Sequence, residues 1–146
     1  MPSRIDVRIL NSNESHVLDN VLPDLFDNSL DAVSTDAFFA SDLHHIAVAL
    51  DGPTVVGMST ATTLLHPDKA PVGFIAEVGV HDDYLRRGIA TRLLKCLMAH
   101  LRDLGITDIW LATETDNVPA RGLYQSLDAR ETQGIVVYDW GHAMDG

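Results

Sequence analysis

Positive charge is scarce in this chain: 10 lysines and arginines stand against 21 aspartates and glutamates, which gives a formal net charge of −11. Nucleic-acid phosphates attract basic surfaces, so this balance argues against a nucleic-acid partner. Cationic small molecules or basic peptides are the partners that an acidic surface attracts. A high net charge also keeps a protein soluble, whatever it binds. We therefore expect no nucleic-acid partner, and both a cationic partner and simple solubility stay open as explanations.

Cysteine and long apolar runs are scarce as well. The single Cys96 excludes an internal disulfide and fits a reducing cytoplasm, where we expect the protein. No apolar run is long enough to span a membrane and no signal-peptide pattern is found, so no membrane partner is expected. The histidines show no ligand spacing, and the adjacent His44 and His45 would point to opposite faces of a strand. No metal is predicted, and residues 1–146 are predicted to form one domain.

Hydrophobic periodicity predicts a mixed α/β chain. Apolar residues alternate with polar ones over 5–9, a pattern typical of a half-buried strand. Asp51-Gly52-Pro53 joins two β-rich segments and predicts a hairpin. Pro23 should end or kink a helix, so the segment 24–42 is expected to begin as a broken helix pair. The full expectation is strands at 5–9, 45–50, 54–63, 73–80, 108–112 and 135–140, and further helices at 17–22, 89–104 and 118–127.

The segment Leu85-Arg86-Arg87-Gly88-Ile89-Ala90 lies between a predicted strand and a predicted amphipathic helix. A helix N-terminus offers unpaired backbone N–H groups and the positive end of the helix dipole. Gly88 lets the backbone approach a ligand closely, and the two arginines add positive charge. The lysine of a P-loop and the three glycines of a dinucleotide fingerprint are both missing. The segment therefore predicts a site for the phosphates of another cofactor, with a solvated basic turn as the alternative.

This segment resembles the acetyl-CoA pyrophosphate loop of the GNAT N-acetyltransferases, Gln/Arg-x-x-Gly-x-Gly/Ala, with Leu85 at its first position. The segment 117–124 resembles the family's Asn-x-x-Ala-x-x-Leu-Tyr signature in the right order and at the right separation, and Asp128 stands where the family usually has a glycine. The resemblance implies an α/β GNAT fold, with a mixed central sheet, a splayed strand pair and flanking helices. It implies acetyl-CoA as cofactor, bound by Val78, Gly79, Val80, Arg86, Arg87, Gly88, Ile89, Ala90, Thr91, Asn117 and Tyr124.

The resemblance also implies catalytic roles. Glu77 lies on the strand that would flank the thioester, and it is expected to take a proton from the acceptor amine, directly or through water. Tyr124 is expected to give a proton to the departing thiolate. A backbone N–H near Val78 would stabilise the oxyanion, and Asn117 would hydrogen-bond the cofactor arm. A surface glutamate and a core aromatic with a satisfied hydroxyl are the alternative explanations of the two side chains.

Within the family, the chain is similar to the small aminoglycoside 3-N-acetyltransferases. The similarity rests on the segments 38–49, 77–80 and 114–120 and on Tyr138-Asp139. It implies an aminoglycoside, a cationic small molecule, as the acceptor. By the same resemblance the acidic segment 24–42 forms part of the acceptor-side wall, although a solvated acidic face explains the same residues. The substrate-binding residues that it implies are Glu77, Glu114, Asp116 and Asp139.

Two other functions are compatible with the same motifs. One is acetylation of a different amine, such as a polyamine, an amino-sugar metabolite or a protein N-terminus, which would keep the roles of Glu77 and Tyr124. The other is a CoA-binding sensor without catalysis, and Leu85 and Asp128, which depart from the family pattern, are consistent with it. Homodimers are common in the family, so a homodimer is compatible with the resemblance.

Overall fold

The computed structural model describes residues 4–145, which divide into two compact units, a first unit that ends at Ala112 and a second that begins at Thr113. The second unit holds α3 (Val118–Ser126) and the short 3-10 helix η3 (Ala143–Asp145). The expectation of one domain stays a prediction. The elements of the first unit are β1 (Ile5–Ile9), η1 (Ser15–Asp19), α1 (Ala32–Ala40), β2 (His44–Asp51), β3 (Thr54–Leu64), β4 (Val72–Val80), η2 (Asp82–Tyr84), α2 (Ile89–Asp103) and β5 (Ile109–Trp110).

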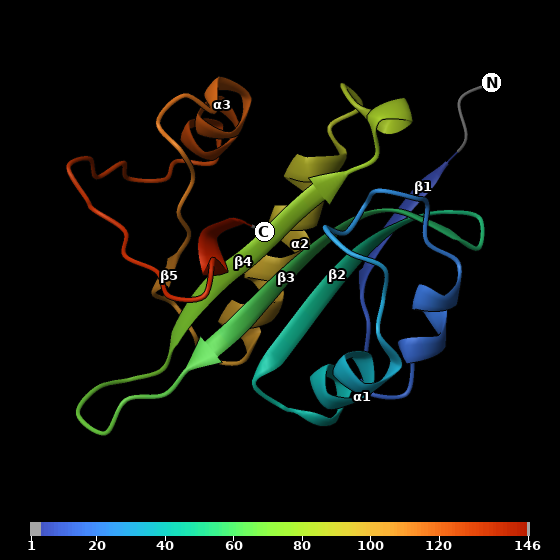
Figure 1. The fold of residues 1–146 in the computed structure, drawn as a ribbon, viewed down its shortest axis with the longest axis horizontal. Coiled ribbons are helices and arrows are strands. Elements are labelled where there is room, and N and C mark those ends of the chain that lie inside the picture. Colours follow the sequence, from blue (N-terminus) through green and yellow to red (C-terminus); the bar gives the residue numbers. More distant parts are fainter. Residues whose placement is uncertain (1–3, 146) are drawn as a thin grey trace. The chain divides into compact units, whose positions relative to one another are not determined.

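A five-stranded mixed sheet in the order β1-β2-β3-β4-β5 forms the centre of the first unit (Figure 1). The first four strands are antiparallel neighbours, because each connection between β2, β3 and β4 returns directly to the adjacent position. The β2–β3 hairpin closes through Gly52, whose φ of 56° a glycine adopts without strain. This mixed sheet with flanking helices confirms the expected α/β architecture.

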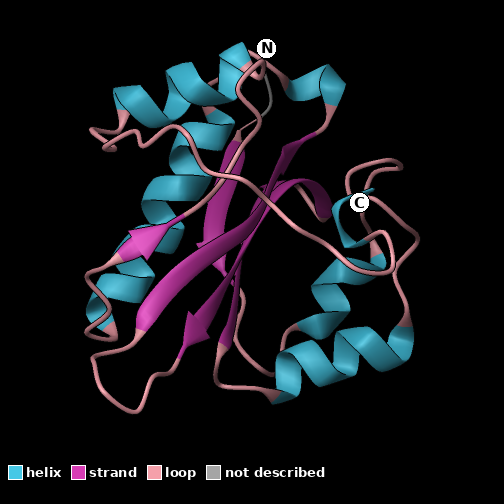
Figure 2. Cartoon of the chain, turned by 60° about the vertical axis from the view of Figure 1, so that its left-hand side comes forward, coloured by secondary structure: helices cyan, strands magenta, loops and turns pink. Residues whose placement is uncertain are grey.

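One face of the sheet is covered by α2, and helical segments lie on both sides of the strands in Figure 2. A Cβ added at Gly57 of β3 would lie 3.1 Å from the Leu93 side chain, so the helix approaches the strand closely. Successive strand residues point to opposite faces, so Met58 belongs to the other face. The helix buries one stripe at helical spacing, which consists of Ile89, Leu93, Leu94, Leu97 and Leu101.

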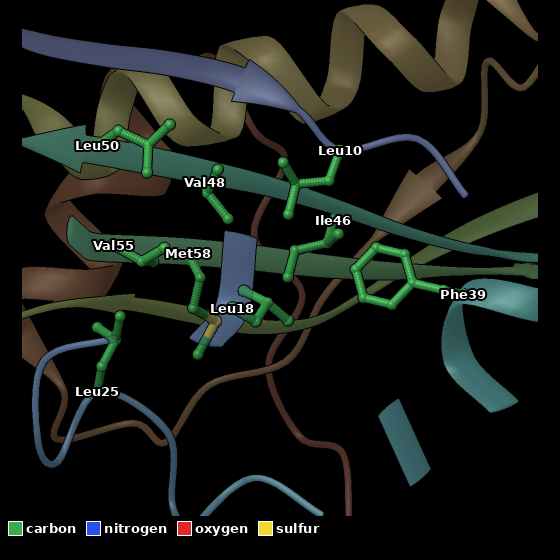
Figure 3. Close-up of a cluster of buried hydrophobic side chains, with 9 residues drawn as sticks. All are labelled: Leu10, Leu18, Leu25, Phe39, Ile46, Val48, Leu50, Val55 and Met58. Carbon is green, nitrogen blue, oxygen red and sulfur yellow. The ribbon is translucent and has the colours of Figure 1, made fainter. Parts of the chain in front are cut away.

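The other face of the sheet carries the main apolar cluster (Figure 3). Leu18 of η1 and Phe39 of α1 pack there against Ile46 of β2 and Met58 of β3. All four side chains are less than 9% exposed. The segment between β1 and β2 is therefore held on the sheet by its own apolar residues, and it forms a wall on the face opposite α2.

An extra residue in β4 interrupts its pairing with β3. Thr60 of β3 lies opposite Glu77, but the next residue of β3 lies opposite Ile75. Ala76 is left without a partner position and forms a β-bulge. A bulge shifts the alternation of side chains along its strand, so residues before and after Ala76 follow different phases.

The glycines of β4 show the result of this shift. A Cβ on Gly73 would lie 3.1 Å from the Leu101 side chain of α2, whereas a Cβ on Gly79 would lie 3.3 Å from the Leu25 carbonyl oxygen on the opposite face. The two positions are six apart, and unbroken alternation would put them on one face. Glu77 shares the phase of Gly79, so its side chain lies on the face opposite α2.

The strand next to β4 separates from it early. β5 runs parallel to β4 and pairs with it only at Gly73 and Phe74. Beyond Phe74, no strand within residues 4–145 pairs with this edge of β4. The expected splayed strand pair is therefore confirmed, and the open edge runs past Glu77 to Val80.

Three of the sequence-based elements are wrong. The expected helix at 17–22 is the short 3-10 helix η1, which ends at Asp19, and Val21 then forms an isolated parallel bridge with Val55 of β3. The expected helix pair in 24–42 is α1 alone, since Asp24 has a φ of 65° that no α-helix accommodates.

The third wrong element is the expected strand at 135–140, which does not form. Its side chains are exposed, and Trp140 is 85% exposed. The second unit holds no strand within its described residues, and a strand needs a neighbour to satisfy its backbone groups. The strand at 108–112 does form, but only over Ile109–Trp110. No helix in residues 4–145 combines the length and the apolar composition that crossing a membrane requires.

Candidate active site

The phosphate segment forms a loop that ends in the first turn of α2. Arg86 and Gly88 both have positive φ, 64° and 72°, and Gly88 is the N-cap of the helix. The first helical N–H with a partner inside the helix is that of Arg92, which donates to the Gly88 carbonyl oxygen at 3.1 Å. Gly88 has no side chain that could cap the turn, so the N–H groups of residues 89–91 face outward without an intrahelical acceptor. With the helix dipole, these donors have the arrangement that binds phosphate oxygens.

The open edge of β4 presents backbone groups of alternate residues. The Ser59 hydroxyl donates to the Glu77 carbonyl oxygen at 2.8 Å, and the His81 N–H donates to a β3 carbonyl at 2.9 Å. Backbone groups alternate in direction along a strand, so those of Glu77, Gly79 and His81 face β3. The N–H and C=O groups of Val78 and Val80 therefore face the open edge. An extended amide-containing ligand could pair there as an additional strand.

A cavity of about 430 Å³ lies on the same face of the sheet as the Glu77 side chain. Glu77 contributes to its floor, where the Thr60 hydroxyl donates to Oε1 of Glu77 at 3.0 Å. Asp27 and Asp31 contribute two further carboxylates, and none of the lining side chains is basic. A hollow with only negative charge attracts a cation. The wall of the cavity comes from Leu18, residues 26–31, Ser34, Thr35, Phe38 and Phe39, and its floor from Ile46, Thr60 and Glu77.

Aromatic side chains form part of the cavity wall. Phe26, Phe38 and Phe39 line it, and the rings of Phe38 and Phe39 meet edge to face with centroids 5.5 Å apart. Asp31 fixes the start of this wall, since its Oδ2 accepts the Ser34 N–H at 2.8 Å and so caps α1. That hydrogen bond holds the pKa of the Asp31 carboxyl below its ordinary value. The cavity thus offers a carboxylate floor and an aromatic wall to one ligand.

The second signature motif lies in the second unit. Asn117 is the N-cap of α3, and its Oδ1 accepts the Ala120 N–H at 3.2 Å, so this oxygen is engaged in the helix cap. Tyr124 lies two turns along the same helix, and partial burial raises the pKa of its phenol. Asp128 follows the helix with a φ of 64°, the left-handed conformation that the family's usual glycine would take.

The predicted site residues divide between the two units. The first unit brings Glu77 together with Thr60, the cavity and the open edge of β4. The acidic residues Glu114, Asp116 and Asp139 belong to the second unit and are not among the cavity-lining residues. Asp139 uses its carboxylate locally, accepting the Met144 N–H at 3.0 Å. The substrate-binding roles of these three residues stay predictions.

Residues 15–128 match the model of the acetyltransferase (GNAT) family. The chain belongs to this family. The two motifs thus identified the right class of protein, and the cofactor of that class is acetyl-CoA. The phosphate loop, the open strand edge and the cavity lie within the matched residues.

Curated relatives of the chain include two proteins named N-alpha-acetyltransferase and a mycothiol acetyltransferase of Saccharomonospora viridis, which is 28% identical over 109 residues that cover 73% of this chain and 36% of that protein. N-alpha-acetyltransferase 30 of Schizosaccharomyces pombe is 31% identical over 80 residues, which cover 55% of this chain and 53% of that protein. An N-alpha-acetyltransferase of Saccharolobus solfataricus is 29% identical over 104 residues, which cover 70% of this chain and 61% of that protein. The chain thus matches only about a third to three fifths of the length of these relatives.

Solved structures with the same fold include aminoglycoside acetyltransferases. One from an uncultured soil metagenomic sample, in complex with trehalose, has a TM-score of 0.82 at 18% identity and covers 93% of this chain and 95% of its own. AAC(6′)-Iy, in complex with a CoA-containing bisubstrate analog of acetylneamine, has a TM-score of 0.77 at 19% identity over 94% of this chain and 99% of its own. At these identities the likeness shows the fold.

Most residues that line the cavity could not be identified from the sequence. Thr60, which holds Glu77, carries no local signal, because only the pairing of β3 with β4 brings the two together. Phe26, Phe38 and Asp27 lie in a segment whose acidic residues were equally compatible with a solvated face. The adjacent Phe38 and Phe39 were the one available signal, since neighbouring aromatics in an acidic segment indicate a surface that packs against something.

Proposed function

We propose that this protein transfers the acetyl group of acetyl-CoA to a primary amine of a cationic small molecule, an aminoglycoside, with Glu77 as base and Tyr124 as acid. The observation that supports this most is the position of Glu77. Its carboxylate belongs to the floor of a cavity without basic side chains, on the strand whose other edge is open. An ammonium drawn into that cavity meets a proton acceptor next to the place where an extended cofactor arm can pair.

The residues of the chain divide the reaction between them. Acetyl-CoA supplies an acetyl group activated as a thioester. The N–H groups of residues 89–91, with Arg86 and Arg87, bind its phosphates. Glu77 takes a proton from the acceptor ammonium, and the Thr60 hydroxyl orients the carboxylate that does so. The Val78 N–H, at the open edge, donates to the acetyl oxygen as negative charge develops on it. Tyr124 gives its proton to the sulfur that leaves, and Asn117 hydrogen-bonds the cofactor arm.

An aminoglycoside suits the acidic side chains of the cavity. It carries several ammonium groups, so Asp27 and Asp31 can bind one while Glu77 deprotonates another. Glu114, Asp116 and Asp139 are proposed to bind further ammonium groups of the same substrate. The names of the solved neighbours support this acceptor. The sequence resemblance favours the 3-N amine, whereas the neighbour with the bisubstrate analog is named for the 6′ position.

The aromatic side chains of the cavity favour a second candidate, the α-amine of a protein N-terminus. Phe26, Phe38 and Phe39 would contact an apolar first side chain while Glu77 receives the proton of the α-ammonium. The names of two curated relatives support this acceptor. An aminoglycoside has no comparable apolar group, so the two candidates differ in how they use these rings.

The experiment is thiol release from acetyl-CoA with a panel of kanamycin-like and gentamicin-like aminoglycosides, polyamines and peptides with apolar or acidic first residues. Release with aminoglycosides supports the first candidate, and NMR of the product assigns the acetylated amine. Release confined to peptides with apolar first residues establishes the second candidate instead. Acetyl-CoA binding without release in any arm contradicts both and leaves a CoA-binding sensor.

A further inference from the structure

Three side chains connect the β2–β3 hairpin with the phosphate loop. The Tyr84 hydroxyl, at the end of η2, donates to Oδ2 of Asp51, the last residue of β2. The guanidinium carbon of Arg87 lies 5.0 Å from the centroid of the Tyr84 ring, within the range of a cation–π contact. Arg87 immediately precedes Gly88, the N-cap of α2. The contacts therefore lead from the rigid sheet to the residue beside the helix N-terminus.

His81 holds the turn of η2, where its Nδ1 accepts the Asp83 N–H at 3.2 Å and its ring meets that of Tyr84 edge to face. η2 is anchored at its base, where the Tyr84 N–H donates to the His81 carbonyl oxygen at 2.8 Å. The next bond along the chain, from the Leu85 N–H, is long at 3.4 Å. Arg86 then adopts a positive φ of 64°, a conformation that is unfavourable for a residue with a side chain. A loop of this kind needs a side-chain contact to hold its arginines in one place.

We propose that Tyr84 is a positioning residue for the cofactor: held by Asp51, its ring keeps the Arg87 guanidinium beside the α2 N-terminus, where the cofactor phosphates bind. A guanidinium that lies over an aromatic face keeps its N–H donors free in its own plane. The ring therefore orients Arg87 without consuming its hydrogen bonds to phosphate. This role concerns the cofactor alone and does not depend on which amine is acetylated.

The test compares two acetyl donors, acetyl-CoA and S-acetyl-pantetheine, of which only the first carries the nucleotide phosphates. Tyr84→Leu removes the ring and the hydroxyl, and should raise the KM for acetyl-CoA about tenfold with kcat unchanged, because a misplaced Arg87 loses its phosphate contact. Tyr84→Phe keeps the ring and loses only the bond to Asp51, so a rise of about threefold is expected. With S-acetyl-pantetheine, which has no nucleotide phosphates, neither variant should change KM. Asp82→Asn, an exposed residue in the same turn, is the control and should match the wild type.

A double-mutant cycle separates positioning from general damage to the loop. In an Arg87→Gln background, Tyr84→Leu should have no further effect on acetyl-CoA affinity, since the residue through which it acts is gone. Additive losses would overturn the proposal, as would equal losses with S-acetyl-pantetheine. CoA binding by calorimetry answers the same question without an acceptor. Failure of the proposed acetyl transfer would thus be seen separately from failure of this inference.

Discussion

Gly88 and Gly105 mark the two ends of α2, and together they test whether the phosphate loop needs its left-handed N-cap. Gly88 has a φ of 72° and Gly105 a φ of 84°, and a Cβ added to either would meet no atom within 4 Å. Substitution by alanine therefore adds the same backbone strain at both ends, about 1–2 kcal/mol, without a steric clash. The two sites differ in what holds the strained conformation.

Gly105 is fixed by hydrogen bonds on both sides. Its N–H donates to the Arg102 carbonyl oxygen, and the Ile106 N–H donates to that of Leu101, both at 2.9 Å, which is the Schellman pattern of a helix end. Gly88 has no comparable pair of bonds, so with alanine at this position the loop can change its backbone conformation and thereby relieve the strain. In Gly105→Ala the strain should lower folding stability, and in Gly88→Ala it should lower the population of the binding-competent loop.

The expected magnitudes follow from that difference. Gly88→Ala should weaken acetyl-CoA binding about tenfold, since 1.4 kcal/mol corresponds to a factor of ten. Gly105→Ala should lower Tm by roughly 3–6 °C and leave acetyl-CoA affinity unchanged. Gly88→Asn should recover much of the affinity, because asparagine tolerates the left-handed conformation. Calorimetric binding and thermal unfolding measure both effects. Equal affinity of wild type and Gly88→Ala would refute the reasoning, as would equal affinity losses at the two ends.

Two more perturbations follow from the cavity and from the core beneath α2. Phe38→Ala should raise the KM for the acceptor about fivefold, because a ring contact is lost, and should leave the KM for acetyl-CoA unchanged. A change in the KM for acetyl-CoA alone would contradict the position of Phe38 in the cavity. His45 is 7% exposed, and burial, followed by the charges of His100 and His44, lowers its pKa from 6.5 to about 4. Between pH 6.5 and pH 4 the His45 ring is protonated in the unfolded chain but stays neutral in the folded protein. The unfolded chain therefore gains stability as the pH falls, and the free energy of unfolding should drop by about 2 kcal/mol between pH 7 and pH 5. Urea unfolding at the two pH values should show this drop in the wild type and a smaller one in His45→Gln, which has no titrating ring at position 45. An unchanged drop would assign the effect to other groups.

The sequence predicted those parts of the molecule whose signal is local. The apolar stripe of α2 and the Gly52 turn appear in the structure, because periodicity and glycine conformation act within a few residues. The loop at Gly88 is local in the same sense: a helix N-terminus after a glycine presents its N–H groups whatever surrounds it. These are the features from which the phosphate site and the family could be inferred.

Features that depend on pairing between distant segments could not be predicted. The bulge at Ala76 is defined by the pairing of β4 with β3. The sequence of β4 alone does not indicate that the alternation of its side chains shifts before Glu77. The contact between Thr60 and Glu77 has the same origin. Conversely, residues 135–140 have the composition of a strand but no neighbouring strand within the described part of their unit, so their β-propensity is not realised.

The central claim is that Glu77 is the base of an acetyl transfer, and Glu77→Gln tests it most directly. Glutamine keeps the size of the side chain and can still accept the Thr60 hydrogen bond, but it cannot take a proton at neutral pH. We predict a loss in kcat of about 100-fold or more, with acetyl-CoA affinity within about twofold of the wild type, and no change for the exposed control Asp103→Asn. Full turnover by Glu77→Gln would contradict the account, and so would an equal loss of acetyl-CoA binding.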